Sequence, residues 1–230
     1  MTRQRTNTGN ALRNIWIFAW CAFLLVATCL MVRLSLPYTS LKKDVDFLLT
    51  KQKTWHILYW RISFYIHVFV SSIVLLAGFT QFSRYIMRRR PLFHRRMGIV
   101  YVTTVLAFSA PTGFVMGLHA NGGLPAKTSF VLLSISWFAT TLLALYYAKR
   151  KAFVIHGDWM LRSYALTLSA IALRLYALLF DVLHINMQPR PVYITIAWLS
   201  WIPNLLIAEI LIRKGFSKKI IAAMPELPAA

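Results

Sequence analysis

Cysteine is nearly absent from this sequence, with Cys21 and Cys29 as the only two among 230 residues. They stand eight positions apart in one apolar run, so on a helix they are separated by about 12 Å along the axis, beyond disulfide reach. No spacing typical of a structural metal site or a redox pair accompanies them. We therefore expect no disulfide framework and no metal centre of cysteines.

Charged residues are also few, at 14% of the chain, and acidic ones are scarce, with 6 Asp and Glu against 26 Lys and Arg. In a soluble protein the net charge of +20 would suggest a nucleic-acid partner. Here 58% of the residues are hydrophobic and the basic residues stand between long apolar runs. Membrane topology and attraction to anionic lipid headgroups account for that pattern. We expect a lipid bilayer as the partner and no nucleic acid.

Six apolar runs are each long enough to cross a hydrocarbon core, which needs about 20 helical residues. They are Trp16–Val32, Ile57–Thr80, Met97–Gly117, Phe130–Tyr147, Trp159–Leu183 and Val192–Ile212. Lys and Arg gather before the first run, between the second and third, between the fourth and fifth, and after the sixth. Short loops rich in these residues stay cytoplasmic. The sequence predicts an all-α, polytopic membrane bundle of six transmembrane helices in the cell inner (plasma) membrane, with both termini cytoplasmic.

No loop is long enough for a sizeable soluble domain. We divide the chain into a cytoplasmic segment 1–14, a transmembrane domain 15–213 and a cytoplasmic tail 214–230. The part of the tail from Ile220 to Ala230 carries too little apolar mass to dock. Gly113 and Gly117 form a GxxxG pair, which predicts close helix packing and an oligomer contact.

Ionisable and polar side chains inside the runs each need a reason, because a charge at the bilayer centre costs about 2.5–3.5 kcal/mol. Arg162 and Glu209 fall at similar depths and predict a structural salt bridge between the fifth and sixth helices. Arg174 has no carboxylate at its level, which predicts a polar pocket or an anionic ligand. The alternative is that the Arg174 side chain extends outward along the helix and pairs with Asp181.

Histidines define the most specific hypothesis. A membrane haem needs two imidazoles from different helices at one depth. His94 and His156 meet this test near the inner surface, and His119 and His184 meet it near the outer surface, where solvation of helix ends is the simpler reading. His67 alone is deep, with no second histidine at its level.

Several motifs resemble a family of bacterial predicted membrane proteins, domain-of-unknown-function family 2306, over residues 57–213. These motifs are Gln81-Phe82, His94-Arg95-Arg96-Met97-Gly98 with Tyr101, Asp158-Trp159-Met160-Leu161-Arg162-Ser163-Tyr164-Ala165-Leu166, Arg174-Leu175-Tyr176 and Trp201-Ile202-Pro203-Asn204-Leu205-Leu206-Ile207-Ala208-Glu209. The family name implies no activity. A looser likeness to six-helix, two-haem transmembrane cytochromes implies haem ligands among His67, His94 and His156.

Two functions follow as expectations. The first is a b-type haem electron carrier that serves a quinone or redox partner, with no metal besides the haem iron. The second is a non-enzymatic carrier, sensor or assembly protein with a polar cavity around Arg174, His67, Asn204 and Gln81. A membrane enzyme using His and Glu ranks third, since no nucleophile elbow, P-loop or metalloprotease motif is present. The sequence leaves open whether the protein is an enzyme.

Overall fold

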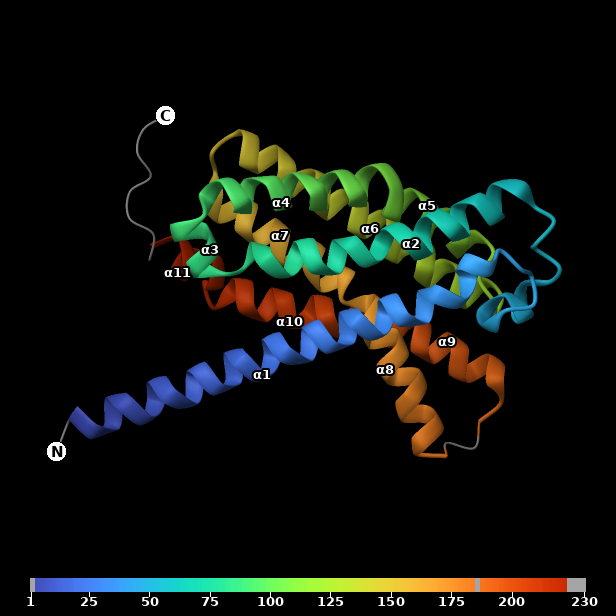
Figure 1. Cartoon of the computed structure of the whole chain (residues 1–230), viewed down its shortest axis with the longest axis horizontal. Coiled ribbons are helices and arrows are strands. Elements are labelled where there is room, and N and C mark those ends of the chain that lie inside the picture. The colour runs from blue at the N-terminus through green and yellow to red at the C-terminus, as the bar shows by residue number, and fades with distance from the viewer. Residues whose placement is uncertain (1–2, 185–186, 223–230) are drawn as a thin grey trace.

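The computed structural model describes residues 3–184 and 187–222, and within those ranges every regular element is a helix. Six helical segments are long and apolar enough to cross a membrane, and most of them run along the long axis of the molecule (Figure 1). They are Cys21–Ser40, Leu58–Gln81, Pro91–Leu118, Leu124–Lys149, Phe153–Val182 and Pro189–Arg213. The predicted all-helical bundle with six spans is confirmed. The side of the membrane on which the termini lie stays a prediction.

The first, second and fourth spans are built on long continuous helices. These are α1 (Arg3–Ser35), α2 (Leu58–Gln81) and α6 (Leu124–Lys149), with the 3₁₀ helices η1 (Leu36–Ser40) and η2 (Asp46–Lys51) between the first two. Pro125 lies in the first turn of α6, where a missing backbone N–H leaves no helical hydrogen bond unmade.

The third and sixth spans are interrupted beside their internal prolines. Their parts are α4 (Pro91–Thr103), the π-helical η3 (Thr104–Ser109) and α5 (Ala110–Leu118), then α9 (Pro189–Leu199) and α10 (Ile202–Arg213). Proline lacks an N–H, and its ring clashes with the carbonyl four residues earlier. The helix therefore widens into a π turn before Pro111 and breaks before Pro203, so that each proline falls in the first turn of the next helix.

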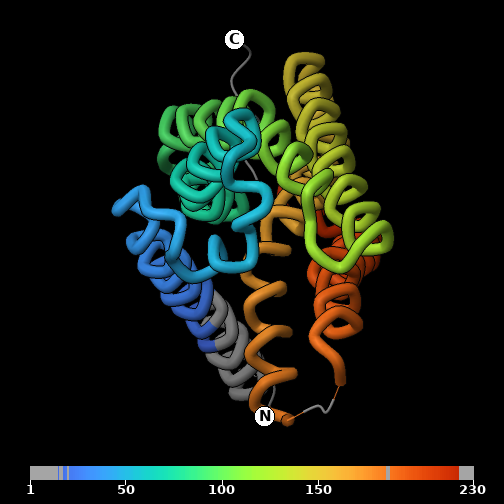
Figure 2. The backbone as a smooth tube through the Cα atoms, turned by 90° about the vertical axis from the view of Figure 1, so that its right-hand side faces the viewer, coloured from blue at the N-terminus to red at the C-terminus, as the bar shows by residue number. Residues whose placement is uncertain are grey.

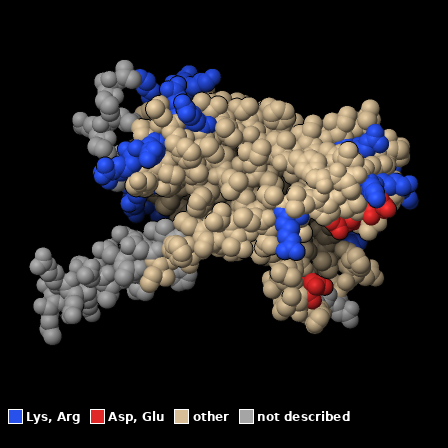
Figure 3. Space-filling model, in the orientation of Figure 1, with Lys and Arg blue, Asp and Glu red and all other residues tan. Residues whose placement is uncertain are grey.

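The fifth span bends without a proline. Its parts are α7 (Phe153–Thr167) and α8 (Ser169–Val182), which meet at Leu168. α7 lies inside the bundle, whereas α8 leaves the bundle sideways in both views (Figures 1 and 2). The short helices α3 (Arg84–Arg89) and α11 (Phe216–Ala222) lie where α2 ends and α4 begins. We call this the basic end, because the Arg-rich segment 84–96, which covers α3 and the start of α4, belongs to it. Figure 3 shows basic side chains gathered at the ends of the long axis.

A buried hydroxyl network joins α4, α6 and α7 in the core. The hydroxyl of the fully buried Tyr101 lies 2.7 Å from Ser163 Oγ and 2.8 Å from Thr167 Oγ1. Ser163 Oγ lies 2.7 Å from Thr141 Oγ1, and Trp137 Nε1 donates to Thr167 Oγ1. Because a hydroxyl both donates and accepts, every member has a partner, and the network holds the three helices at defined relative heights.

A buried lysine joins η2 to the α5–α6 loop at the opposite end of the bundle. The Lys51 residue is 3% exposed, and its Nζ donates to His119 O at 2.6 Å and to Asn121 Oδ1 at 2.7 Å. Burial, with a smaller effect of nearby Lys127, lowers the pKa of Lys51 to about 8.

Stability is therefore expected to depend on Lys51 in alkaline solution. The folded-state pKa of about 8 lies below the ordinary 10.5, so between these values the unfolded chain binds more protons and stability rises with pH. Lys51→Met should lack this contribution. The difference in free energy of unfolding between wild type and Lys51→Met should grow by up to about 3 kcal/mol across the window. Denaturation at several pH values measures it, with the exposed Lys53→Met as control. A constant difference would contradict the titration.

Candidate functional site

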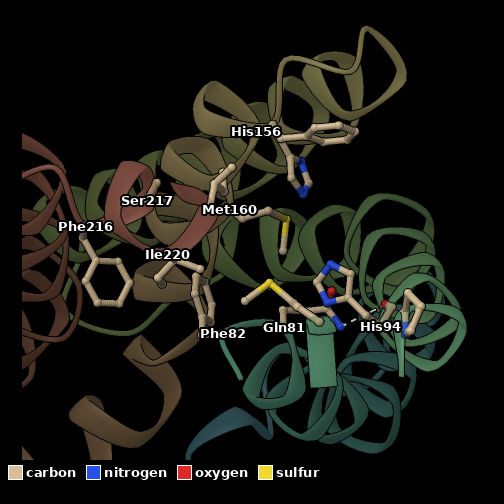
Figure 4. Close-up of a pocket in the computed structure, with 13 residues that line it drawn as sticks. Gln81, Phe82, His94, His156, Met160, Phe216, Ser217 and Ile220 are labelled. Atoms are coloured by element: carbon tan, nitrogen blue, oxygen red, sulfur yellow. Dashed lines mark hydrogen bonds between the residues drawn. The ribbon is translucent and has the colours of Figure 1, made fainter. Parts of the chain in front are cut away.

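A pocket of about 310 Å³ opens at the basic end between α2, α4 and α7, and α11 covers it. Its walls are mostly apolar, from phenylalanine, methionine, isoleucine and proline, with a few polar groups among them (Figure 4). The lining residues are Gln81, Phe82, Met87, Pro91, His94, Phe153, His156, Gly157, Met160, Phe216, Ser217, Ile220 and Ile221. An apolar pocket with a few convergent polar groups is the form of a small-molecule or cofactor site, and this volume is at the small end of the usual range.

The structure brings His94 and His156 to this pocket from different helices. Each is the fourth residue of its helix, since α4 begins at Pro91 and α7 begins at Phe153. Their imidazole rings extend toward each other across the pocket (Figure 4). The equal positions follow from the similar turns before them, in which the chain leaves one helix, passes a basic segment and begins the return helix.

Hydrogen bonding differs between the two imidazoles. His156 Nδ1 lies 2.8 Å from Ala144 O, and because a carbonyl only accepts, Nδ1 carries the proton and Nε2 keeps a lone pair. His94 Nδ1 is buried and has no hydrogen-bond partner among the described residues. An unpaired buried polar atom costs about 1–3 kcal/mol of stability. A group that bound this nitrogen in the pocket would remove that cost.

Gln81 supports the start of α4 from the end of α2. Its Nε2 donates to Thr80 Oγ1 at 3.1 Å and makes longer contacts of 3.4 Å with Ala77 O and His94 O. A Cβ added at Gly98 would lie 3.1 Å from Gln81 Oε1, so this glycine leaves room for the amide. Gln81 thus belongs to the histidine pocket.

α11 is the part of the site that the sequence did not predict. Ile220 is 7% exposed and Ser217 is 4% exposed, whereas Lys218 and Lys219 on the other face are exposed. The prediction that the tail does not dock was wrong for Ile220–Ala222, and residues 223–230 lie outside the described part. The alternation of buried and exposed residues along α11 is the sequence signal that could have predicted its docking. The apolar mass of α11 is small, but Gly157 lets this helix approach closely, with 3.0 Å between Ser217 Cβ and a Cβ placed at Gly157.

His67 lies apart from the pocket. It precedes Gln81 by fourteen residues on α2, which is about 21 Å along the axis. Its Nδ1 is 3.0 Å from Ser109 O, at the end of the π-helical segment, and 3.2 Å from Thr112 Oγ1. The structure does not bring His67 together with His94 and His156.

Arg174 is bonded to its own helix, and Asn204 to the break between α9 and α10. Arg174 is exposed, and its Nη1 donates to Ala170 O at 2.9 Å. Asn204 Nδ2 donates to Ser200 O at 3.0 Å. No hydrogen bond or ion pair joins Arg174 to Asp181 in the described part of the chain. With Gln81 at the basic end, these residues form no common hydrogen-bonded site.

The structure brings Arg162 and Glu209 together between α7 and α10. Arg162 Nε donates to Oε1 at 2.5 Å and Nη2 donates to Oε2 at 2.9 Å, which is a bidentate pair. The guanidinium also stacks 4.5 Å from the centre of the Trp159 ring. Two parallel charge-assisted hydrogen bonds fix the relative orientation of the helices.

Arg162→Leu is expected to destabilise the protein because Glu209 is left unpaired. The side chains are 20% and 35% exposed, so the loss should be roughly 1–3 kcal/mol, below the 3–5 kcal/mol of a fully buried pair. Arg162→Leu combined with Glu209→Leu should recover most of this loss. Thermal unfolding of the four proteins of this cycle in one detergent measures the coupling. If the double variant loses as much stability as the two single variants together, the pair makes no joint contribution.

Gly113 and Gly117 face neighbours within the chain. A Cβ at Gly113 would lie 3.1 Å from His67 Cε1, and one at Gly117 would lie 3.2 Å from the backbone of Phe130 and Val131. Both glycines therefore allow α5 to pack closely on α2 and α6. The oligomer expected from this motif stays a prediction.

Comparison with known proteins gives one match. A family model described as "Predicted membrane protein (DUF2306)" matches residues 64–212, which is about two thirds of the chain and includes most of the pocket. No curated protein and no solved structure matches.

Proposed function

The chain belongs to the DUF2306 family of predicted membrane proteins, and since that name assigns no activity, we propose from the site itself that the protein is a b-type haem electron carrier. His94 and His156 would hold the iron from opposite walls of the pocket. The carrier would act in the cell inner (plasma) membrane and exchange electrons with a quinone or a redox partner.

The observation that carries this proposal is the pair of facing imidazoles (Figure 4). His156 has its Nδ1–H engaged by Ala144 O, which leaves the Nε2 lone pair for a metal. A backbone carbonyl on the second nitrogen is the usual arrangement for a metal-bound histidine, because it fixes both tautomer and ring orientation. The unpartnered Nδ1 of His94 shows that the second ring is not committed to a described neighbour.

The types of donor and the apolar walls support this proposal. Two imidazoles from different helices at one depth are the ligands that a membrane haem requires, and apolar walls suit a porphyrin face. Arg88, Arg89 and Arg90 lie exposed at the end of α3, beside the pocket, and would offer cations to carboxylate substituents. When bound, haem supplies reversible one-electron chemistry.

The other residues of the pocket have roles that follow from their positions. Phe82, Met160 and Ile220 line the pocket with apolar surface, which would keep water away from a bound haem. Ala144 O orients one imidazole, and Gln81 supports the turn that carries the other. The positively charged loops at the same end favour a cytoplasmic location for this half of the bundle.

An absorption spectrum of the detergent-purified protein tests the proposal, air-oxidised and then reduced with dithionite after expression with ample haem supply. A Soret band, with an α-band that sharpens on reduction, is the expected result. A colourless protein, or one that carries a metal ion without a Soret band, would overturn it.

A further inference from the structure

One short helix, α11, covers the histidine pocket at the basic end. Four of its residues line the pocket, namely Phe216, Ser217, Ile220 and Ile221. In Figure 4 the three of them that carry labels lie on the side of the pocket away from the two histidines. The opposite face of α11 carries lysines that are exposed. α11 is therefore a wall of the pocket on one face and part of the molecular surface on the other.

The joint between α10 and α11 leaves room for movement. α10 ends at Arg213 and α11 begins at Phe216, so two residues connect the helices. One of them, Gly215, has a φ of 70°, which glycine adopts without steric cost. A Cβ placed on Gly215 would meet nothing within 4 Å. Rotation of the backbone at this glycine therefore meets no packed side chain, and α11 can swing while the bundle stays fixed.

The contacts that hold α11 against the bundle are few and apolar. Among the described residues, no hydrogen bond or salt bridge joins a side chain of α11 to another helix. Its buried residues are Ser217, which packs on Gly157, and Ile220. Neither belongs to the hydrophobic core around Tyr101 and Tyr164. A segment with few buried apolar contacts opens locally at a much lower cost than that of global unfolding.

We propose that α11 is a hinged lid, and that the occupant of the histidine pocket enters and leaves beneath it at the basic end. Closed, the lid shields the apolar walls from water. Lys218 and Lys219 are already exposed in the closed position, so opening takes no charge out of water. For haem as the occupant, the proposal rests on the function proposed above. The movement of α11 itself does not depend on what the pocket holds.

Maleimide labelling of a thiol inside the pocket tests the movement without haem. The reporter is Met160→Cys, at a position in the pocket wall that is 4% exposed, in the full chain with both native cysteines changed, Cys21→Ser and Cys29→Ser. Under native conditions the rate of labelling by N-ethylmaleimide follows the population of the open state. Ile220→Ser removes an apolar anchor of the lid. It should raise the rate at least about tenfold, the factor that corresponds to burial of one isoleucine side chain.

A matched control lies on the same helix. Lys219→Ser also shortens a side chain of α11, but on the exposed face, and should leave the labelling rate unchanged. A second reporter, Leu166→Cys, replaces a core residue that is 1% exposed and should stay unreactive with either change. Equal labelling of the pocket thiol in Ile220→Ser and Lys219→Ser would overturn the lid. Parallel acceleration at Leu166→Cys would show a general loosening of the bundle and would overturn it as well.

The rate of haem uptake separates this inference from the proposed function. When haem is added to the haem-free protein, Ile220→Ser should acquire the Soret band faster than Lys219→Ser. If neither acquires the band while the pocket thiol responds as expected, the haem proposal fails and the lid stands. If the thiol responds but both variants take up haem at one rate, haem enters by another route, and the assignment of α11 as its entrance is overturned.

Discussion

His156→Ala is expected to abolish the Soret band of the haem-supplied protein, and His94→Ala is expected to do the same. Under the proposed function each substitution would remove one of the two residues that would hold the iron, and the rings face each other with no other histidine of the described residues at the pocket (Figure 4). Ultraviolet and visible spectra at equal protein concentration, with haem quantified per chain, measure the loss.

Two controls distinguish a ligand from a residue that merely supports folding. His119→Ala and His184→Ala change histidines outside the pocket and should leave the spectrum intact. Imidazole added to the two alanine variants should restore part of the band by occupying the vacated position. Variants that keep the full band would exclude these histidines as ligands. Variants that lose the band without imidazole rescue, but melt as wild type does, would also argue against axial ligation.

Gly78→Ala is expected to produce the largest loss of stability among single-methyl changes in the core. A Cβ at Gly78 would lie 2.5 Å from Cδ2 and Cε2 of Tyr164 and 2.8 Å from Cε2 of Tyr101. Both rings are buried, and the Tyr101 hydroxyl is held by Ser163 and Thr167, so neither ring can move away freely. Overpacking of this kind costs about 1–3 kcal/mol or more. The loss should appear as a lower melting temperature in detergent.

Gly98→Ala is the matched control, since it also places a methyl group in a membrane helix. Its nearest neighbour would be the flexible amide of Gln81, at 3.1 Å. We expect a much smaller fall in melting temperature for Gly98→Ala than for Gly78→Ala. Equal effects would show that helix propensity, rather than the contact with the two tyrosines, decides the cost.

Much of the candidate site could be predicted because depth follows from position in a helix. A residue at a given distance from the end of a span has a defined height, at about 1.5 Å per residue. This placed His94 level with His156, and Arg162 level with Glu209. Depth alone does not give the direction of a side chain. The sequence therefore could not predict that Arg174 is exposed on the lipid-facing side of α8. It also could not predict that His67 lies apart from the pocket.

The breaks in the spans were only partly visible in the sequence. Pro111 and Pro203 mark two of them, because a missing N–H and a bulky ring act locally. The bend at Leu168 has no such local cause, and its direction depends on what α7 and α8 pack against. α11 docks for a similar reason: its few apolar side chains suffice only because Gly157 allows close approach.

By itself the sequence determined the membrane class, the six spans and the family, because hydrocarbon thickness and helical rise act on every apolar run independently of the others. The tertiary structure alone decided which side chains share a pocket, that α11 covers it, and that Arg174 has no acidic partner among the described residues. Those properties depend on the rotation of each helix about its axis, which is set by close packing between helices that are distant in the chain.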